Sequence, residues 1–349
     1  MFPENLVFDE VVTPKDFDSL SELVETTYRV DHEQTTLESI ALKPDGTLHT
    51  PEGEWRVARD LWEQCSLAIG MPLAYAYKVS PALFCENFAQ RQAETTAPVT
   101  ISRVGDVATG LIVDRKSRYR PACTADVLRA VRRSEGLTLC RASVSFAGVD
   151  VELAQAGNVV EPTVGDIIQL GIAITNSESG GRQLKASAYS YRLACTNGAI
   201  MSDEIGTARW PNDLRMTAAA SLLAFQKQVS ALIDKLESVS PLYTNNVQKL
   251  VPDVELFNLW RRVAYVLPRN EADDVLGMAE TERRDLQQLI RLRDTRESPA
   301  MTERNAYEVH NRITFAAHGR NFRNRRSLQE IGGEFLSRAS AWPAIAGAT

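Results

Sequence analysis

The apolar positions in the first hundred residues recur mainly at helical spacing. From about Glu54 they follow one helical face until Gly70 ends the pattern. Ser80 before a proline is typical of a helix N-terminus, which predicts a second helix from Pro81 to Glu94. Residues 1–50 mix acids, threonine and proline with little periodicity, so we expect a loosely ordered acidic segment there.

From Ala97 the pattern changes to the period of β-strands. Two β-rich runs, Val99–Arg103 and Ala108–Asp114, flank Gly105-Asp106 and predict a hairpin. A short basic helix is expected from Ala125 to Ser134. Further strands are expected at Leu137–Phe146, Val149–Leu153, Ile167–Asn176 and Gln183–Cys195. Glycine-containing turns separate these runs, which favours one sheet of four or five antiparallel strands.

After Pro211 the helical period returns. The apolar residues between Leu222 and Val239 lie on one helical face. Later helices are expected at Val247–Val266, Ala272–Arg293, Thr302–Ala317 and Ser327–Arg338, before a frayed tail at Ala339–Thr349. The pattern predicts an α+β fold, in which an antiparallel β-meander sheet is preceded by short helices and followed by a long-helix C-terminal part. We divide the chain into residues 1–50, a core at 51–210, a helical part at 211–338 and a tail at 339–349.

Charge is distributed unevenly along a chain whose formal net charge is −6. Residues 1–60 contain 14 acidic and 5 basic residues, a net charge of −9. Residues 103–145 contain 9 basic and 4 acidic residues, and residues 302–327 contain 6 arginines and 2 acids. This separation favours a local surface that binds anions.

The composition is that of a globular protein, with 44% hydrophobic and 24% charged residues. No apolar run approaches the roughly 20 residues that span a bilayer. The first ten residues have neither a basic leader nor an apolar stretch, and the five cysteines are scattered. We therefore expect a cytoplasmic protein with reduced thiols, without disulfides, structural zinc or membrane association.

Residue patterns that indicate catalysis are weak. The sequence has no Walker A motif, no dinucleotide-binding glycine motif and no serine nucleophile elbow. His310 and His318 are too far apart to share a metal without a third ligand, and Cys195 has no histidine near it in sequence. Acidic pairs such as Asp273-Asp274 are typical of solvated surface. We therefore expect no enzyme and no cofactor.

The basic stretch "DRKSRYRP" follows an apolar strand, and its composition favours binding to a nucleic acid. Its cations can neutralise phosphates, and its tyrosine can stack on a base, as in single-strand binding. The simpler interpretation is a solvated turn whose long side chains pack over apolar neighbours. The candidate contacts are Arg115, Lys116, Arg118, Tyr119, Arg120, Arg132 and Arg133, with a second basic strip at Arg320, Arg323, Arg325 and Arg326.

Several stretches together resemble the phage- and plasmid-related family catalogued as domain of unknown function 932. They are "SRYRP", "VGDIIQLGIAITNSESGG", "YRLACTNG" and "NAYEVHNRIT". The resemblance runs from about Trp55 to Leu336. The arrangement is also distantly similar to Redβ/Erf-type single-strand annealing proteins, which form rings or filaments and bind DNA in a basic groove between sheet and helices.

The resemblance implies a protein of phage or plasmid origin that binds single-stranded DNA, promotes strand annealing in recombination and forms a homo-oligomer. Multiple subunits suit this activity because each contact is weak and salt-sensitive. An alternative is an oligomeric structural or regulatory protein that acts through protein partners. A third is an enzyme whose site is spread over unrelated segments.

Overall fold

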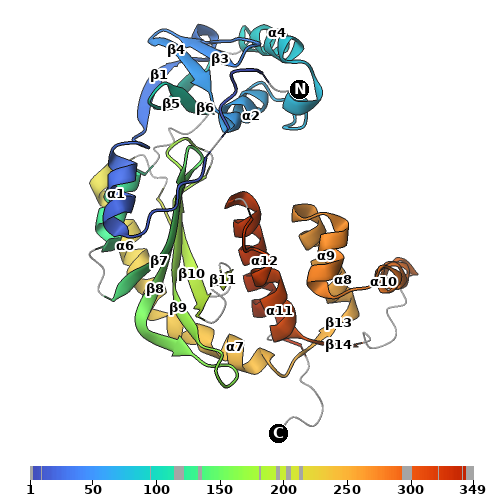
Figure 1. Cartoon of the computed structure of the whole chain (residues 1–349). Coiled ribbons are helices and arrows are strands. Elements are labelled where there is room, and N and C mark those ends of the chain that lie inside the picture. Colours follow the sequence, from blue (N-terminus) through green and yellow to red (C-terminus); the bar gives the residue numbers. More distant parts are fainter. Residues whose placement is uncertain are drawn as a thin grey trace.

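The fold, seen in a computed structural model, is α+β, as the sequence predicts. The structure describes residues 3–8, 10–94, 96–113, 122–132, 136–180, 182–193, 197–201, 206–211, 215–292, 301–320, 322–339 and 341–342. The described residues form two six-stranded β-sheets, one two-stranded sheet and several helices, with the N-terminal sheet above the central sheet in Figure 1. Within these described ranges, no helix combines the length and apolar character needed to cross a bilayer.

The N-terminal unit is a mixed six-stranded sheet with its own apolar core. Its strand order is β1-β5-β6-β4-β3-β2, and only β4 and β6 run parallel. Trp62 and Phe84 are buried in its core, where their rings lie 4.6 Å apart. The strands are β1 (Asp31–Thr36), β2 (Ala41–Leu42), β3 (Thr47–Thr50), β4 (Gly53–Val57), β5 (Pro98–Val104) and β6 (Val107–Val113). The helices are η1 (Leu37–Ser39), α2 (Arg59–Ala68), α3 (Tyr75–Lys78) and α4 (Pro81–Gln92).

This unit corrects three expectations. Residues 1–50 contain α1 (Phe17–Glu25) and three strands and are not loosely ordered. The expected start of a helix at Glu54 is a strand instead, and α2 begins at Arg59. The predicted hairpin does form as β5 and β6, but it belongs to the N-terminal sheet because β5 pairs with β1 and β6 pairs with β4. The predicted Ser80 cap of α4 is confirmed, with the side chain accepting from Leu83 N.

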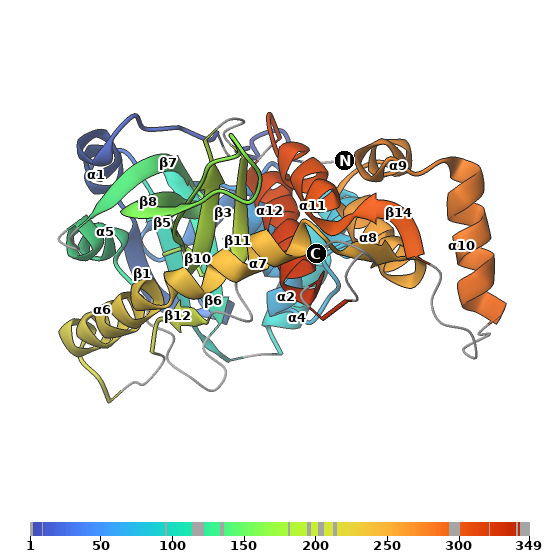
Figure 2. The ribbon, with the colours of Figure 1, turned by 90° about the horizontal axis from the view of Figure 1, so that it is seen from below.

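The central sheet is the predicted antiparallel meander. Its order is β11-β10-β9-β8-β7, with β12 also paired to β10. The strands are β7 (Leu137–Ser145), β8 (Gly148–Val160), β9 (Ile168–Asn176), β10 (Lys185–Arg192), β11 (Asn197–Met201) and β12 (Thr207–Arg209). Figure 2 shows α1, α5 (Thr124–Arg132) and α6 (Ala218–Asp234) on one side of this sheet and α11 (Ala306–Phe315) and α12 (Phe322–Ala339) on the other.

The two faces of the central sheet differ in chemistry. The face toward α5 and α6 carries valine, leucine and isoleucine, and these residues form the largest apolar core. The opposite face carries small and polar residues, including buried Ser143, Asp150 and Glu152. Strand alternation produces this division, because odd-numbered and even-numbered positions of β8 point to opposite faces. The polar face requires hydrogen-bonding partners from the helices that cover it.

The C-terminal helices build a third core beside the sheet. It includes α8 (Asp253–Val266), α9 (Arg269–Leu276), α10 (Glu280–Leu292), α11 and α12. They are joined to the sheet by η2 (Leu236–Val239), α7 (Ser240–Asn246) and the short β13 (Leu250–Pro252) and β14 (Met301–Asn305) pair. The single helix expected at Ala272–Arg293 is divided into α9 and α10, because Gly277 adopts a left-handed C-cap with φ 60°. Most of the expected frayed tail lies outside the described residues.

Candidate nucleic-acid interface

The basic stretch itself lies outside the described residues. This applies to Arg115, Lys116, Arg118, Tyr119 and Arg120, and also to Arg133. The structure does describe both flanks of the stretch, where β6 ends at Val113 and α5 begins at Thr124. Each of these two flanks is held by contacts with other described parts of the chain.

The α5 flank is held by the turn between β9 and β10. The Asn176 side-chain amide donates to the carbonyl oxygen of Ala122 over 2.8 Å and to Oγ1 of Thr124 over 2.9 Å. The Thr124 backbone N–H donates to Oε1 of Glu178 over 2.8 Å. Asn176 is buried, and burial together with these bonds fixes Ala122 and Thr124 against the sheet.

The β6 flank is held by the same turn. The Oγ atoms of Thr109 and Ser179 are hydrogen-bonded at 2.9 Å. A Cβ atom on Gly110 would lie 2.0 Å from the Ser179 carbonyl oxygen, so only glycine permits this approach of β6 to the turn. A Cβ atom on Gly180 would similarly lie 2.4 Å from Cγ1 of Ile112. We call residues 176–180 the stem clamp, because this one turn holds both flanks of the basic stretch.

The stem clamp coincides with a motif that the sequence already singled out. Asn176 to Gly180 is the "NSESG" part of the stretch that carries the family resemblance. The local sequence predicts only a hairpin turn for these residues. Their additional contacts join the N-terminal sheet to the central sheet, and Ser102 Oγ of β5 also donates to the carbonyl oxygen of Glu178. No pattern in the local sequence indicates contacts at this separation along the chain.

Arg132, the described member of the first candidate set, faces acidic residues of α1. Its Nη1 lies 2.6 Å from Oδ1 of Asp18. One turn earlier, Arg129 pairs with Glu25 at 3.2 Å and with Asp126 at 2.9 Å. All of these side chains are about half exposed or more. The acidic α1 and the basic α5 therefore lie side by side, and both arginines that the structure describes on α5 are paired with carboxylates.

The second expected basic strip does not form one outward surface. Arg320 pairs with Glu271 of α9, and the side chain of Arg323 lies outside the described residues. Arg325 donates to Oγ of Ser143 over 3.1 Å. Arg326 is buried and lies 3.4 Å from Asp150 and 3.0 Å from Glu330. The strip differs from expectation because α12 directs Arg325 and Arg326 toward the polar face of the sheet.

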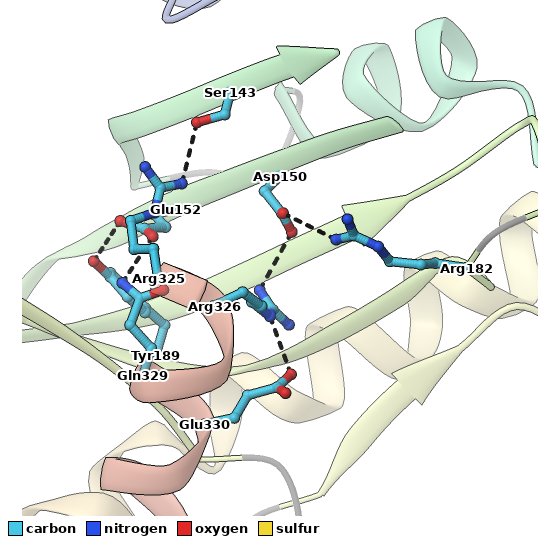
Figure 3. Close-up of polar contacts among 9 residues, drawn as sticks. All are labelled: Ser143, Asp150, Glu152, Arg182, Tyr189, Arg325, Arg326, Gln329 and Glu330. Atoms are coloured by element: carbon cyan, nitrogen blue, oxygen red, sulfur yellow. Dashed lines mark hydrogen bonds and ion pairs between the residues drawn. The ribbon is translucent and has the colours of Figure 1, made fainter. Parts of the chain in front are cut away.

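Arg325 and Arg326 belong to a buried network that the sequence does not predict (Figure 3). Asp150 lies between Arg326 and Arg182, with 3.3 Å to the latter. Glu152 accepts from the Tyr189 hydroxyl over 2.7 Å and from the Gln329 amide over 3.0 Å. Burial raises the pKa of Asp150, and the two guanidinium groups oppose that rise. The only sequence signal was two carboxylates alternating with valine and leucine along a strand.

A second polar cluster brings three motif stretches together at the other end of the sheet. Asp166 binds Arg192 through two hydrogen bonds and also accepts from the Tyr307 hydroxyl. His310 lies against Tyr307 and Tyr243, and its Nδ1 donates to the Gly332 carbonyl oxygen over 2.9 Å. The adjoining cavity is about 10 Å³, which is space for one water molecule. This cluster locks α11 to the sheet and leaves no space for a substrate.

The described residues supply no arrangement typical of metal or thiol chemistry. No group of three or more histidine, cysteine or carboxylate side chains among them is placed to hold a metal ion. Burial raises the pKa of Cys85 to about 12 and that of Cys140 to about 11, so neither thiol ionises readily. Cys195 lies outside the described residues.

Comparisons with protein-family models, with curated proteins and with solved structures find no match to this chain.

Proposed function

We propose that this protein binds single-stranded DNA through the basic stretch 115–120 and promotes strand annealing in recombination. The stem clamp is the observation that carries the proposal. A surface turn with no role beyond solvation has no need of a buried asparagine, two close glycine contacts and a second sheet at its base. The clamp instead suits a loop that must present its side chains in one place.

The composition of the clamped stretch supports nucleic acid as the ligand. Arg115, Lys116, Arg118 and Arg120 offer phosphate contacts, and Tyr119 offers a stacking ring. Arg129 and Arg132 continue the basic character onto α5. Their carboxylate partners are exposed, and exposed ion pairs contribute little to stability. Phosphates can therefore replace those carboxylates at small cost.

The test is a fluorescence-anisotropy titration of the full chain with an unstructured oligonucleotide at about 50 mM salt. We expect saturable binding that Arg118→Glu with Arg120→Glu removes. A matched control is Arg29→Glu with Arg91→Glu, which changes the net charge equally at exposed positions of the N-terminal part. No binding by the wild type, or equal loss in both double variants, would contradict the proposal.

Annealing and assembly are measured separately. Light scattering with and without oligonucleotide gives the subunit number, and the rate at which complementary labelled strands pair gives the annealing activity. We expect a homo-oligomer whose size or annealing rate responds to DNA. A discrete oligomer that is indifferent to DNA would favour a structural or regulatory protein that acts on protein partners.

A further inference from the structure

A groove between α8 and α12 lies away from the basic stretch in sequence and belongs to the third core. Its volume is about 600 Å³, within the range of small-molecule and nucleotide sites. From α8 it is lined by Asn258, Arg261 and Tyr265, and from α12 by Ser327, Glu330 and Glu334. Positions 258, 261 and 265 lie on one face of α8, because they are three and four residues apart.

Tyr265 and Arg261 distinguish this groove from ordinary helix surface. Tyr265 is 93% exposed, so its ring is accessible to a ligand. Arg261 is exposed one turn away on the same face. Among the residues that the structure describes, no carboxylate lies within ion-pair distance of Arg261.

The two carboxylates of the groove are already engaged. Glu334 is paired with Arg262, and Glu330 is paired with Arg326. The charge left without an ion pair in the described lining is therefore the guanidinium of Arg261. A ligand that fits this set carries a negative group one helical turn from a flat ring.

We propose that this groove holds one nucleotide of a single strand, with its base stacked on Tyr265 and its phosphate on Arg261. The Asn258 amide, on the same helix face, is placed to donate to or accept from the base edge. The inference rests on the proposed function, since it assigns a second contact to the strand that the basic stretch holds. Base stacking on an aromatic side chain tolerates any sequence, which suits an annealing protein.

The test compares oligonucleotide affinities of full-length variants by anisotropy. We expect Tyr265→Ala to weaken binding about tenfold, while Tyr265→Phe keeps wild-type affinity because the ring does the stacking. Arg261→Ala should lower the slope of log affinity against log salt by about one. Phe315→Ala is the matched control, because this exposed aromatic lies outside the groove and should leave affinity unchanged.

A direct readout uses an oligonucleotide that carries 5-iodouracil, with the photo-crosslink mapped by mass spectrometry. We expect an adduct at Tyr265 that Arg261→Glu reduces. If Arg118→Glu with Arg120→Glu removes binding but Tyr265→Ala binds as the wild type, the groove proposal fails and the proposed function stands. If the wild type binds no oligonucleotide, both fail. If Tyr265→Ala changes only the subunit number in light scattering, the ring belongs to a protein interface and the nucleotide proposal is wrong.

Discussion

Arginine has two different roles in this molecule, and burial separates them. The Arg132 side chain is 52% exposed beside Asp18, whereas the Arg326 side chain is 10% exposed beside Asp150. Water screens the first pair, so its carboxylate can be exchanged for another anion. The second pair holds two charges in the protein interior, where removing one partner leaves the other with less compensation.

We expect Arg326→Ala to lower the free energy of unfolding by about 3 kcal/mol, because Asp150 then stays buried with Arg182 as its remaining ion-pair partner among the described residues. Arg132→Ala should leave the unfolding midpoint in urea nearly unchanged. Adding Asp150→Asn to the Arg326 variant should recover part of the loss, since it removes a buried carboxylate charge that Arg182 balances only in part. Equal midpoints for the two single variants would contradict the division of roles.

At this scale the sequence predicts residue chemistry better than residue position. The sequence shows that residues 302–327 carry a net positive charge. It does not indicate that Arg325 and Arg326 face the sheet. That direction depends on where α12 lies against β7 and β8. The role of Asn176 has the same origin, because its partners Ala122 and Thr124 are more than fifty residues away along the chain.

Among the elements, the local patterns predict the meander and most helices, and they fail where pairing is distant. The strands β7 to β10 follow one another in sequence and in the sheet, so their alternation is sufficient to predict them. The N-terminal sheet instead pairs β1 with β5 and β4 with β6 across about fifty to seventy residues. Periodicity carries no information about such pairs. The sequence therefore predicts a loose segment in place of β1 to β3, a helix in place of β4, and the central sheet for β5 and β6.

The burial of His310 between α11 and α12 predicts that the stability of the fold depends on pH. Burial lowers the pKa of His310 to about 4, with Gly332, Tyr243, Tyr307, Arg192 and Asp166 around it. The unfolded chain binds a proton at this histidine near pH 6.5, but the folded chain does not until about pH 4. The unfolded state therefore gains protons first as the pH falls, and the folded state loses stability below about pH 6.5.

We expect the contribution of His310 to lower the free energy of unfolding by about 2 kcal/mol between about pH 7.5 and about pH 5. Urea unfolding of the wild type and of His310→Gln at both pH values isolates this contribution, because the variant keeps a donor for Gly332 and cannot titrate. His318→Gln, at an exposed histidine, is the control and should keep the wild-type difference. An unchanged difference in the His310 variant would show that another group is responsible.

In the whole molecule, each of the three parts has its own apolar core, whereas the acidic helix α1 and the basic helix α5 pack against each other. One core lies in the N-terminal sheet, one under the central sheet and one among the C-terminal helices. The core under the central sheet also includes residues beyond 211, such as Phe225 of α6 and Tyr243 of α7. The joint at the stem clamp is made of contacts between the two sheets. The acidic α1, by contrast, leaves its neighbours in the N-terminal part and packs on α5 through buried Leu20 and Val24.

This packing predicts that the acids of α1 oppose DNA binding. Asp18 and Glu25 occupy the guanidinium groups that a phosphate would contact and lower the local positive potential. Leu20 and Val24 are buried in the core of the central sheet, which anchors α1 and its acids beside α5. The effect on affinity should therefore be electrostatic and should weaken as salt shortens the Debye length.

We expect Asp18→Asn with Glu25→Gln to bind single-stranded DNA about tenfold more tightly than the wild type at low salt, with the difference shrinking at about 0.5 M salt. Glu38→Gln with Glu86→Gln changes the net charge equally at exposed positions of the N-terminal part, and so it separates a local from a global effect. An equal gain in affinity in both double variants would show that α1 acts only through the overall negative charge of the protein. A gain confined to the α1 variant would mean that the acidic segment sets how readily the basic face accepts a strand, because its carboxylates and the phosphates compete for the same two arginines.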